Sequence, residues 1–228
     1  MIQMKNVYKK YPNGIVALNG MNVEIEQGEF VYVVGPSGAG KSTFIKMMYR
    51  EERPTSGQML VDGIDIATLK NKKVPLLRRQ IGVVFQDFKL LPRLNVYENV
   101  AFALEVIEES PSKIRERVMK VLDMVGLKHK ARMFPTELSG GEQQRVSIAR
   151  SIVNRPKVVI ADEPTGNLDP ETSLDIMNLF EQINASGTTI LMATHNREIV
   201  NTLRHRVIAI EGGLIVRDVA GGDYGYEA

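Results

Sequence analysis

The 228-residue sequence predicts an α/β protein with a mostly parallel sheet, and three patterns carry this prediction. Short runs rich in Val and Ile recur along the chain, as the buried strands of a parallel sheet do. Segments with helical periodicity separate these runs, and the alternation of strand and helix is typical of the α/β class. Two early stretches instead alternate apolar and polar residues, which predicts an additional antiparallel lobe.

The apolar runs predicted as strands of the core lie at 30–35, 81–86, 157–163, 188–195 and 206–213. The helices between them are expected at 41–50, 142–154 and 171–184. Residues 17–30 and 57–66 alternate in polarity and contain Gly turns, as half-buried antiparallel strands do. A small β lobe is therefore expected to precede and overlie the core.

From about residue 95 to 135 the pattern becomes helical, which predicts a helical subdomain inserted in the core. Ser110 suits an N-cap, Pro111 the first helical position and Gly126 the end of one such helix. Its apolar face consists of Ile114, Val118, Val121, Leu122 and Val125. The expected division is 1–94 and 136–215 for the β lobe and core, 95–135 for the helical subdomain, and 216–228 for a C-terminal tail, of which the last stretch, GGDYGYEA, is expected to be loose.

The amino-acid composition limits the classes of partner that the chain is expected to bind. The formal net charge is +2, with 29 basic and 27 acidic residues, so no excess positive field favours nucleic acid as a partner. Cys is absent, which excludes disulfides and thiolate metal sites and is compatible with a reducing cytoplasm. No run approaches the roughly 18 apolar residues that could span a bilayer. Any role at a membrane is therefore expected to depend on a partner.

Residues 35–43 read GPSGAGKST and contain the Gly-x4-Gly-Lys-Ser phosphate loop. Its backbone N–H groups can surround phosphate oxygens, Lys41 can reach the β- and γ-phosphates, and the Ser42 hydroxyl can ligate Mg²⁺. A Gly-rich turn is the alternative, but the strand before the loop and the helix after it favour nucleotide binding. The predicted nucleotide contacts are Gly35, Pro36, Ser37, Gly38, Ala39, Gly40, Lys41, Ser42 and Thr43.

The stretch VVIADEP ends a predicted strand on two acids, Asp162 and Glu163. The carboxyl ends of parallel strands are where α/β sheets bind ligands. Asp162 can hold Mg²⁺ through water, and Glu163 would face the γ-phosphate as the general base or water-orienting residue. Two solvated acids at a strand end are the alternative for this motif taken alone.

Gln86 and His195 also end predicted strands. Taken alone, Gln86 suits a turn and His195 suits a structural hydrogen bond. Each becomes a candidate site residue only because parallel strands end at the same edge of a sheet. A further anion site is expected at LSGGEQQR, where Ser139, Gly140 and Gly141 open a helix whose N-terminus offers free N–H groups.

Six ordered motifs resemble those of the ATP-binding cassette ATPases of membrane transporters, over essentially the whole chain. They are the phosphate loop, Gln86, LSGGEQQR, VVIADEP, GNLD and His195. The resemblance implies a Mg²⁺-dependent ATPase, converting ATP to ADP and phosphate, with a RecA-like core. It also implies that Tyr11 stacks on adenine, that Gln86 senses Mg²⁺ and the attacking water, and that His195 contacts the γ-phosphate.

In this family two cassettes pack head to tail, and the signature loop of one covers the ATP on the phosphate loop of the other. The resemblance therefore implies an ATP-dependent homodimer, with Ser139, Gly140 and Gly141 as the signature loop and Asp169 in the loop linking the two sites. The second anion site would belong to the other cassette's nucleotide, towards which the helix near Ser139 points its positive end.

The segment after Gln86 is unusually apolar for a loop and contains Phe88, Leu90, Leu91 and Tyr97. The resemblance implies that this region and the helical subdomain form a groove for a cytoplasmic helix of a transmembrane partner. Packing of the helical subdomain on the core is the alternative, and both are expected.

The stretch DEPTGNLDP in a short one-domain chain resembles the group that includes lipoprotein-release, macrolide-export and cell-division ATPases. FQDFKLLPRLNVYENVAFALEV most resembles the cell-division members, which implies an FtsX-like transmembrane partner and, indirectly, a peptidoglycan hydrolase. The expected location is peripheral, on the cytoplasmic face of the bacterial plasma membrane at the division site. A subunit of a lipoprotein-release or macrolide-export transporter is the alternative.

Three other classes fit less well. A DNA-repair or chromosome-organising ATPase would carry a long coiled-coil insertion between Gln86 and Ser139, and the short segment there has no heptads. A translation-factor cassette would have two cassettes in one chain. A scaffold that binds nucleotide without hydrolysis would be expected to lose Glu163 or Lys41, and both are present.

Overall fold

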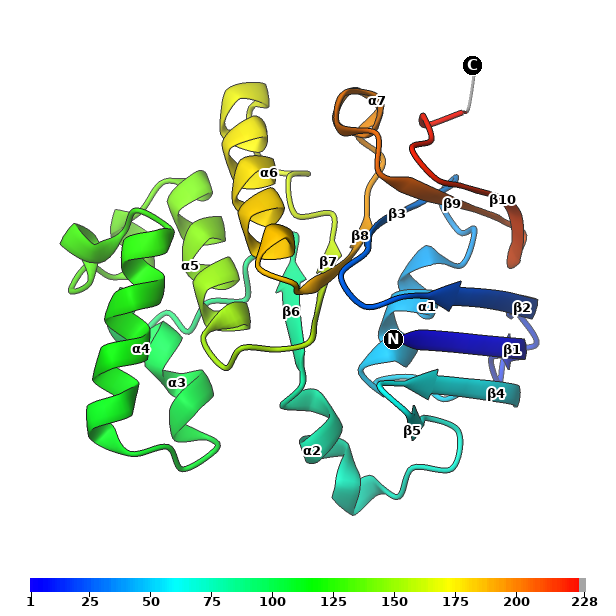
Figure 1. Cartoon of the computed structure of the whole chain (residues 1–228), viewed down its shortest axis with the longest axis horizontal. Helices are drawn as coiled ribbons and strands as arrows, with labels where there is room; N and C mark the ends of the chain where they lie inside the picture. The colour runs from blue at the N-terminus through cyan, green and yellow to red at the C-terminus, as the bar shows by residue number, and fades with distance from the viewer. Residues whose placement is uncertain (226–228) are drawn as a thin grey trace.

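The computed structural model describes residues 1–225 and has a six-stranded sheet at its centre (Figure 1). The strand order is β10-β9-β3-β8-β7-β6, in which only the β9–β10 pair is antiparallel. The strands are β3 (Phe30–Val34), β6 (Ile81–Phe85), β7 (Val158–Asp162), β8 (Thr189–Ala193), β9 (Arg206–Glu211) and β10 (Leu214–Val219). The predicted α/β fold with a mostly parallel sheet is confirmed, and β3 and β6 to β9 each lie inside a predicted apolar run.

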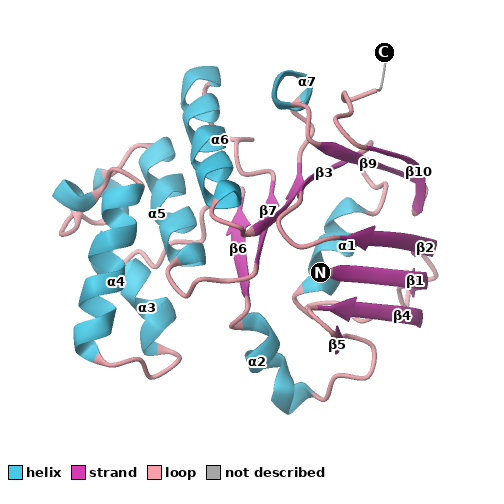
Figure 2. Cartoon of the chain, in the orientation of Figure 1, coloured by secondary structure: helices cyan, strands magenta, loops and turns pink. Residues whose placement is uncertain are grey.

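The parallel strands of this sheet are largely buried on both faces, since successive residues point to opposite sides and each side packs against another layer. On one face Phe30, Tyr32 and Val34 pack with the helices α5 and α6 and the helical subdomain. On the other face Val31 and Val33 pack with α1 and the antiparallel sheet. The helices are α1 (Lys41–Met48), α5 (Gly140–Ile152), α6 (Pro170–Ala185) and α7 (Arg197–Leu203). The parallel sheet thus lies between two covering layers (Figure 2).

A four-stranded antiparallel sheet forms the predicted β lobe, in the order β2-β1-β4-β5. Its strands are β1 (Ile2–Lys10), β2 (Val16–Ile25), β4 (Ser56–Val61) and β5 (Ile64–Asp65). The predicted stretches 17–30 and 57–66 contribute β2, β4 and β5. The central strand β1 was not predicted, because its register shifts between Met4 and Val7 and again before Lys10, which breaks the alternation of polarity.

The helical subdomain contains α3 (Val96–Glu105) and α4 (Pro111–Met124), and lies with α5 at one end of the molecule (Figure 1). Asn95 caps α3, and Ser110 with Pro111 precedes α4 as the sequence predicts. The buried Asn99 amide donates to the carbonyls of Leu91, Leu94 and Asn95, which ties the preceding loop to α3. Between the β lobe and β6 lie a 3₁₀ turn and a short helix, Asn71–Lys73 and α2 (Val74–Arg78).

The expectation of a C-terminal tail from residue 216, loose from residue 221, is partly wrong. Strand β10 extends to Val219 and pairs with β9 across a two-residue turn, Gly212–Gly213, in which both glycines have positive φ. The chain then remains attached, because Gly222 N–H donates to the carbonyl of His205 and Tyr224 is buried. Residues 226–228 of the predicted tail lie outside the described residues. Within the described chain, no helix combines the length and apolar character of a membrane span.

Candidate functional site

A cavity of about 770 Å³ lies at the carboxyl edge of the parallel sheet. The phosphate loop follows β3, Asp162 ends β7, and His195 comes two residues after β8. The strands therefore bring together motifs that are far apart in the sequence. The lining residues are Tyr11, Asn13, Ile15, Ala17, Gly35, Pro36, Ser37, Gly38, Ala39, Gly40, Lys41, Ser42, Thr43, Asp162, Glu163, His195 and Tyr224.

The phosphate loop has a backbone shape that requires glycine. Gly35 and Gly40 have φ values of +143° and +111°, and a Cβ at either position would collide with a carbonyl oxygen, that of Ile210 or that of Ala17. Gly40 directly precedes α1, so the N-terminus of α1 and its N–H groups open into the cavity. A helix N-terminus beside a glycine loop is suited to bind phosphate.

Lys41 lies folded over this loop. Its ammonium group donates to the carbonyl oxygens of Gly35 at 2.6 Å and Pro36 at 3.0 Å. In a nucleotide complex, phosphate oxygens would replace these carbonyls as acceptors for the Lys41 ammonium. The cavity, the loop and this cation together fit the triphosphate of ATP.

Tyr11 lies beside the loop, and its hydroxyl is 3.1 Å from that of Thr43. The ammonium of Lys9 is 4.8 Å from the centre of the Tyr11 ring, within the range of a cation–π contact. The aromatic side chain predicted to stack on adenine is therefore at the rim of the same cavity as the phosphate loop.

Asp162 lies in a partly buried environment beside the charge of Glu163. Burial, and then the neighbouring charge of Glu163, raise the pKa of the Asp162 carboxyl, which Lys46 and Lys41 partly oppose. A divalent cation beside Asp162 would offset both causes. The oxygen donors of Asp162, Ser42 and the Gln86 amide suit Mg²⁺, which needs few protein ligands because phosphates and waters complete its shell. Among residues 1–225 no cluster of three or more His, Cys, Asp or Glu forms a separate metal site.

Glu163 and His195 form a direct pair. Glu163 has φ +50°, an uncommon conformation for a residue with a Cβ, and its N–H donates to the carbonyl of Ala193 on β8. Its carboxylate accepts hydrogen bonds from His195 Nδ1 at 2.8 Å and from the His195 backbone N–H at 3.2 Å. The His195 side chain is 66% exposed, so the rest of its ring is accessible to a ligand in the cavity.

Gln86 is close to this site in the sheet but its side chain is held elsewhere. Its Nε2 donates to Asn167 Oδ1 at 3.1 Å, and Asn167 Nδ2 donates to the backbone carbonyl of Gln86 at 3.1 Å. Gln86 is exposed and is not among the residues lining the cavity. The structure therefore places Gln86 beside the loop that follows Glu163, with Asn167 as a partner that the sequence did not identify.

The signature residues lie apart from their own chain's cavity. Ser139 is the N-cap of α5: its hydroxyl accepts from Glu142 N–H, and the Glu142 carboxylate accepts from Ser139 N–H at 3.0 Å. None of Ser139, Gly140 or Gly141 lines the nucleotide cavity. The structure brings the phosphate loop, Asp162, Glu163 and His195 together and leaves the signature loop outside this group.

Asp169 caps the neighbouring helix α6. Its carboxylate accepts from Thr172 N–H at 2.9 Å and from the Thr172 hydroxyl at 2.6 Å, and these two bonds are the main cause of its lowered pKa. A Cβ at Gly141 would collide with the Thr172 methyl group. The N-termini of α5 and α6 are therefore packed together, which makes Asp169 and the signature loop neighbours.

Gln144 is a residue of this region that sequence reasoning missed. It is fully buried, and its Nε2 donates to the carbonyl of Pro164 at 2.5 Å and to that of Phe85 at 3.4 Å. Pro164 directly follows Glu163, and Phe85 directly precedes Gln86. One amide on the signature helix thus contacts both chain segments that carry site residues. A glutamine within a helix gives no sequence signal of such a contact.

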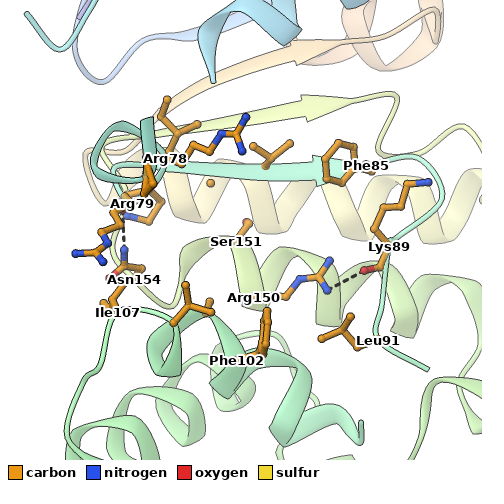
Figure 3. Close-up of a pocket in the computed structure, with 17 residues that line it drawn as sticks. Arg78, Arg79, Phe85, Lys89, Leu91, Phe102, Ile107, Arg150, Ser151 and Asn154 are labelled. Carbon is orange, nitrogen blue, oxygen red and sulfur yellow. Dashed lines mark hydrogen bonds between the residues drawn. The ribbon is translucent and has the colours of Figure 1, made fainter. Parts of the chain in front are cut away.

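A second cavity, of about 540 Å³, lies between β6, α2 and the helical subdomain (Figure 3). Its walls include the apolar side chains of Phe85, Leu91, Phe102, Val106 and Ile107. Its basic residues are Arg78, Arg79, Lys89 and Arg150, and within the described chain its lining includes no acid. We call this cavity the lateral groove.

The residues predicted to form a groove or to pack on the core lie in different surroundings. Leu91 lines the lateral groove, whereas Leu90 packs against the core and Tyr97 lies in another depression on the helical subdomain. Phe88 and Lys89 both have positive φ, and their carbonyls accept hydrogen bonds from the Arg150 guanidinium. This tight turn redirects the side chains that follow it, which the apolar pattern alone does not reveal.

Comparison with known proteins gives consistent results. Residues 18–166 match the family model described as ABC transporter. The chain is 71% identical to the cell division ATP-binding protein FtsE of Bacillus subtilis (strain 168), over 99% of both chains. It is 48% identical to the protein of that name from Escherichia coli (strain K12), over 93% of this chain and 96% of the other.

Solved structures agree over nearly the whole chain. A dimeric structure of a post-hydrolysis state of the ATP-binding cassette MJ0796, bound to ADP and Pi, has a TM-score of 0.87 and 36% identity, covering 97% of this chain and 99% of that one. CbiO1 from Clostridium perfringens, part of the ABC transporter complex cbiONQ, has a TM-score of 0.90 and 33% identity, covering 96% and 88%.

Proposed function

The chain belongs to the ABC transporter family, and we propose that it is the ATP-hydrolysing subunit of a bacterial cell-division complex whose other subunit is an FtsX-like transmembrane protein. One observation carries the enzymatic part: a single cavity collects Lys41, Asp162, Glu163 and His195 beside a phosphate loop. The cell-division part is supported by the 71% identity to a relative of that name, which favours it over lipoprotein release or macrolide export.

Each residue of the site has its own proposed role in ATP hydrolysis. The loop N–H groups and the α1 N-terminus bind the phosphates, and Lys41 moves from the Gly35 and Pro36 carbonyls to the β- and γ-phosphates. Ser42, Asp162 and Gln86 are the proposed ligands of Mg²⁺, which when bound offsets the charge of the phosphates. Gln86 would use its Oε1 for this, since its Nε2 donates to Asn167.

Glu163 is the proposed group that orients the attacking water and takes its proton. The water oxygen bonds to the γ-phosphorus while the bond to the β-phosphate oxygen breaks, which gives ADP and inorganic phosphate. His195 donates from Nδ1 to the Glu163 carboxylate, which holds the ring beside the reaction site. The other ring nitrogen, Nε2, is the proposed contact to the γ-phosphate, to which it donates when it also carries a proton. Tyr11 is the proposed platform for adenine.

Phosphate release from Mg²⁺ and ATP tests this function directly. Purified chain should release inorganic phosphate in proportion to enzyme concentration, and EDTA should stop the release. Binding of a fluorescent ATP analogue without any phosphate release, alone or with the membrane partner, would contradict hydrolysis and leave a nucleotide-dependent scaffold.

We infer that two chains share their nucleotides. Ser139, Gly140 and Gly141 lie outside their own chain's cavity, yet they open a 13-residue helix in the manner of an anion site. In a head-to-tail pair each α5 N-terminus would face the ATP on the other chain, and the Asp169 loop, packed beside it, would lie between the two sites. ATP would then join the dimer and hydrolysis would release it.

The lateral groove is the proposed binding site of the transmembrane partner. Its apolar walls suit one face of an amphipathic helix, and its four basic residues suit acidic residues at the edges of that face. The occupant we propose is therefore a cytoplasmic helix of the FtsX-like protein with an apolar face and flanking Asp or Glu. ATP-driven closure of the dimer would move this helix and act, through the membrane, on a peptidoglycan hydrolase at the division site.

A substitution at the rim of the lateral groove should separate coupling from catalysis. Phe102 and Val106 are 43% and 59% exposed, so Phe102→Asp with Val106→Asp should leave folding and basal hydrolysis nearly unchanged. Co-purification with the membrane partner should weaken by about tenfold or more, because two apolar contacts become repulsive towards the proposed acidic helix.

The matched control is Val216→Asp on β10, which has a similarly exposed side chain far from the groove in sequence and fold. It should bind the partner as the unmodified chain does. Loss of folding in the groove variant would mean that Phe102 and Val106 serve packing of the helical subdomain. Unchanged partner binding in a folded variant would place the partner on another surface.

A further inference from the structure

The last described residues return to the nucleotide cavity. Tyr224 lines this cavity together with Asp162, Glu163 and His195, and it is only 7% exposed. In Figure 1 the C-terminal segment passes from β10 back towards α7, which follows β8. A segment that follows the last strand thus contributes a buried aromatic side chain to the wall of the reaction site.

Several contacts fix this segment in place. Gly222 N–H donates to the carbonyl of His205 at 3.1 Å, and Asp223 pairs with Arg217 of β10 at 2.8 Å. Tyr224 N–H donates to Asn201 Oδ1 at 2.7 Å. The segment is therefore attached to β10, to the start of β9 and to α7 at the same time.

Tyr224 contacts one face of α7. The Arg197 guanidinium is 5.4 Å from the centre of the Tyr224 ring, and Asn201, which accepts the Tyr224 N–H, lies one helical turn further on. The ring belongs to the same buried cluster as Ile199 and Val200 of this helix. Tyr224 thus packs along α7 while facing the cavity.

Helix α7 is directly connected to His195. Asn196 is its N-cap, and this residue both accepts from Ile199 N–H and donates its own N–H to Thr194 Oγ1 at 3.0 Å. The backbone of His195 is therefore held between the end of β8 and the start of α7. Its N–H and its Nδ1 both donate to the Glu163 carboxylate, so a shift of α7 would move the donors of that pair.

We propose that Tyr224 is a positioning residue for ATP hydrolysis: by packing on α7 it keeps His195 in hydrogen-bond contact with Glu163. This inference rests on the proposed function, since it assigns a role in the same reaction. Burial is the main cause of the raised pKa of Tyr224; the charge of Arg197 opposes it, and the charge of Glu163 adds to it.

Two substitutions test the proposal through steady-state kinetics. Tyr224→Ala should lower kcat for ATP by about tenfold while the KM for ATP changes by less than about twofold, because the phosphate loop and Tyr11 are untouched. Tyr224→Phe keeps the packed ring, and recovery of kcat by this variant would assign the effect to packing on α7. A Phe variant as slow as the Ala variant would overturn packing on α7 as the cause, since the ring is retained.

Two further variants guard against a general loss of stability. Asn201→Ala removes the acceptor of the Tyr224 N–H without removing a core side chain, and kcat should fall in the same direction. Val216→Ala on the exposed face of β10 should keep the kcat of the unmodified chain. Each variant is first compared with the unmodified chain by thermal unfolding.

The outcomes separate this inference from the function on which it rests. If the unmodified chain releases no phosphate, the proposed function fails. If it does and Tyr224→Ala has an unchanged kcat, the positioning role is overturned. The role is also overturned if kcat and KM worsen together in proportion to a lowered unfolding temperature, since that pattern belongs to a structural residue alone.

Discussion

Glu163→Gln should stop ATP hydrolysis while ATP remains bound, and it should trap a dimer of the chain. The amide keeps the shape of the carboxylate but cannot accept a proton from water, so phosphate release should fall by more than about a hundredfold. The phosphate loop, Lys41 and Ser42 are unchanged, and ATP binding should persist. Because hydrolysis is the proposed route to dimer release, size-exclusion chromatography with light scattering should show a doubled mass in Mg²⁺ and ATP.

Controls make this result specific. The same variant should run as a monomer in ADP, and adding Lys41→Ala to it should abolish the ATP-dependent dimer. Glu211→Gln, at an exposed position at the end of β9, should hydrolyse ATP as the unmodified chain does. A Glu163→Gln chain that binds ATP yet stays monomeric at high protein concentration would contradict the shared-nucleotide arrangement.

The core of the fold could be predicted because its strands are buried on both faces. Such strands appear as continuous apolar runs, and β3, β6 and β7 lie at the predicted positions. Strand β1 instead carries polar residues such as Lys5 and Asn6 on an irregular register, and Asn6 has positive φ. Local pattern could not identify it, because its register depends on pairing with β2 and β4.

Part of the candidate site could be predicted from the sequence, and part could not. The phosphate loop, Asp162, Glu163 and His195 could be placed together, because each lies at or just beyond the carboxyl end of a strand in one parallel sheet. Contacts that a side chain makes with a distant segment could not be foreseen. Gln86 donates to Asn167, Gln144 donates from inside a helix to the carbonyls of Phe85 and Pro164, and Tyr224 belongs to a segment that was expected to be loose.

The lateral groove shows a third reason why sequence reasoning falls short. The apolar residues after Gln86 were expected both to form a groove and to pack the helical subdomain on the core, without any means of dividing them between the two; Leu91 lines the lateral groove and Leu90 packs against the core. Two consecutive residues with positive φ, Phe88 and Lys89, reverse the chain there, and Arg150 secures the turn through their carbonyls. Neither residue type signals this conformation, so the direction of each following side chain depends on the tertiary contact with α5.

Ser139→Arg and Lys41→Ala should each abolish hydrolysis alone and partly restore it when mixed. Lys41→Ala removes the cation that faces the β- and γ-phosphates, so tight ATP binding or turnover is lost. Ser139→Arg places a bulky side chain at the N-terminus of α5, where it blocks access of a phosphate to the N–H groups. Its own phosphate loop is intact, so a single Ser139→Arg chain should still bind a fluorescent ATP analogue.

Loss of the N-cap needs its own control, because replacing the Ser139 hydroxyl costs about 1 kcal/mol of helix stability. Ser139→Ala loses the same cap without adding bulk, and it should retain more hydrolysis than Ser139→Arg. Ser110→Arg places the same side chain at the N-terminus of α4, where Ser110 makes no side-chain capping bond, and it should be active. Thermal unfolding of all variants separates folding defects from blocked sites.

The mixture of Ser139→Arg and Lys41→Ala chains then decides where the signature loop acts. In a mixed dimer one shared site carries both substitutions, while the other combines the intact phosphate loop of the Ser139→Arg chain with the intact signature loop of the Lys41→Ala chain. If one intact site suffices, up to about half of the dimers formed by random pairing regain one active site, and phosphate release returns. If both loops served the same chain, every chain in the mixture would remain defective. Absence of recovery in mixed dimers demonstrated by differential tags would therefore reject independent shared sites.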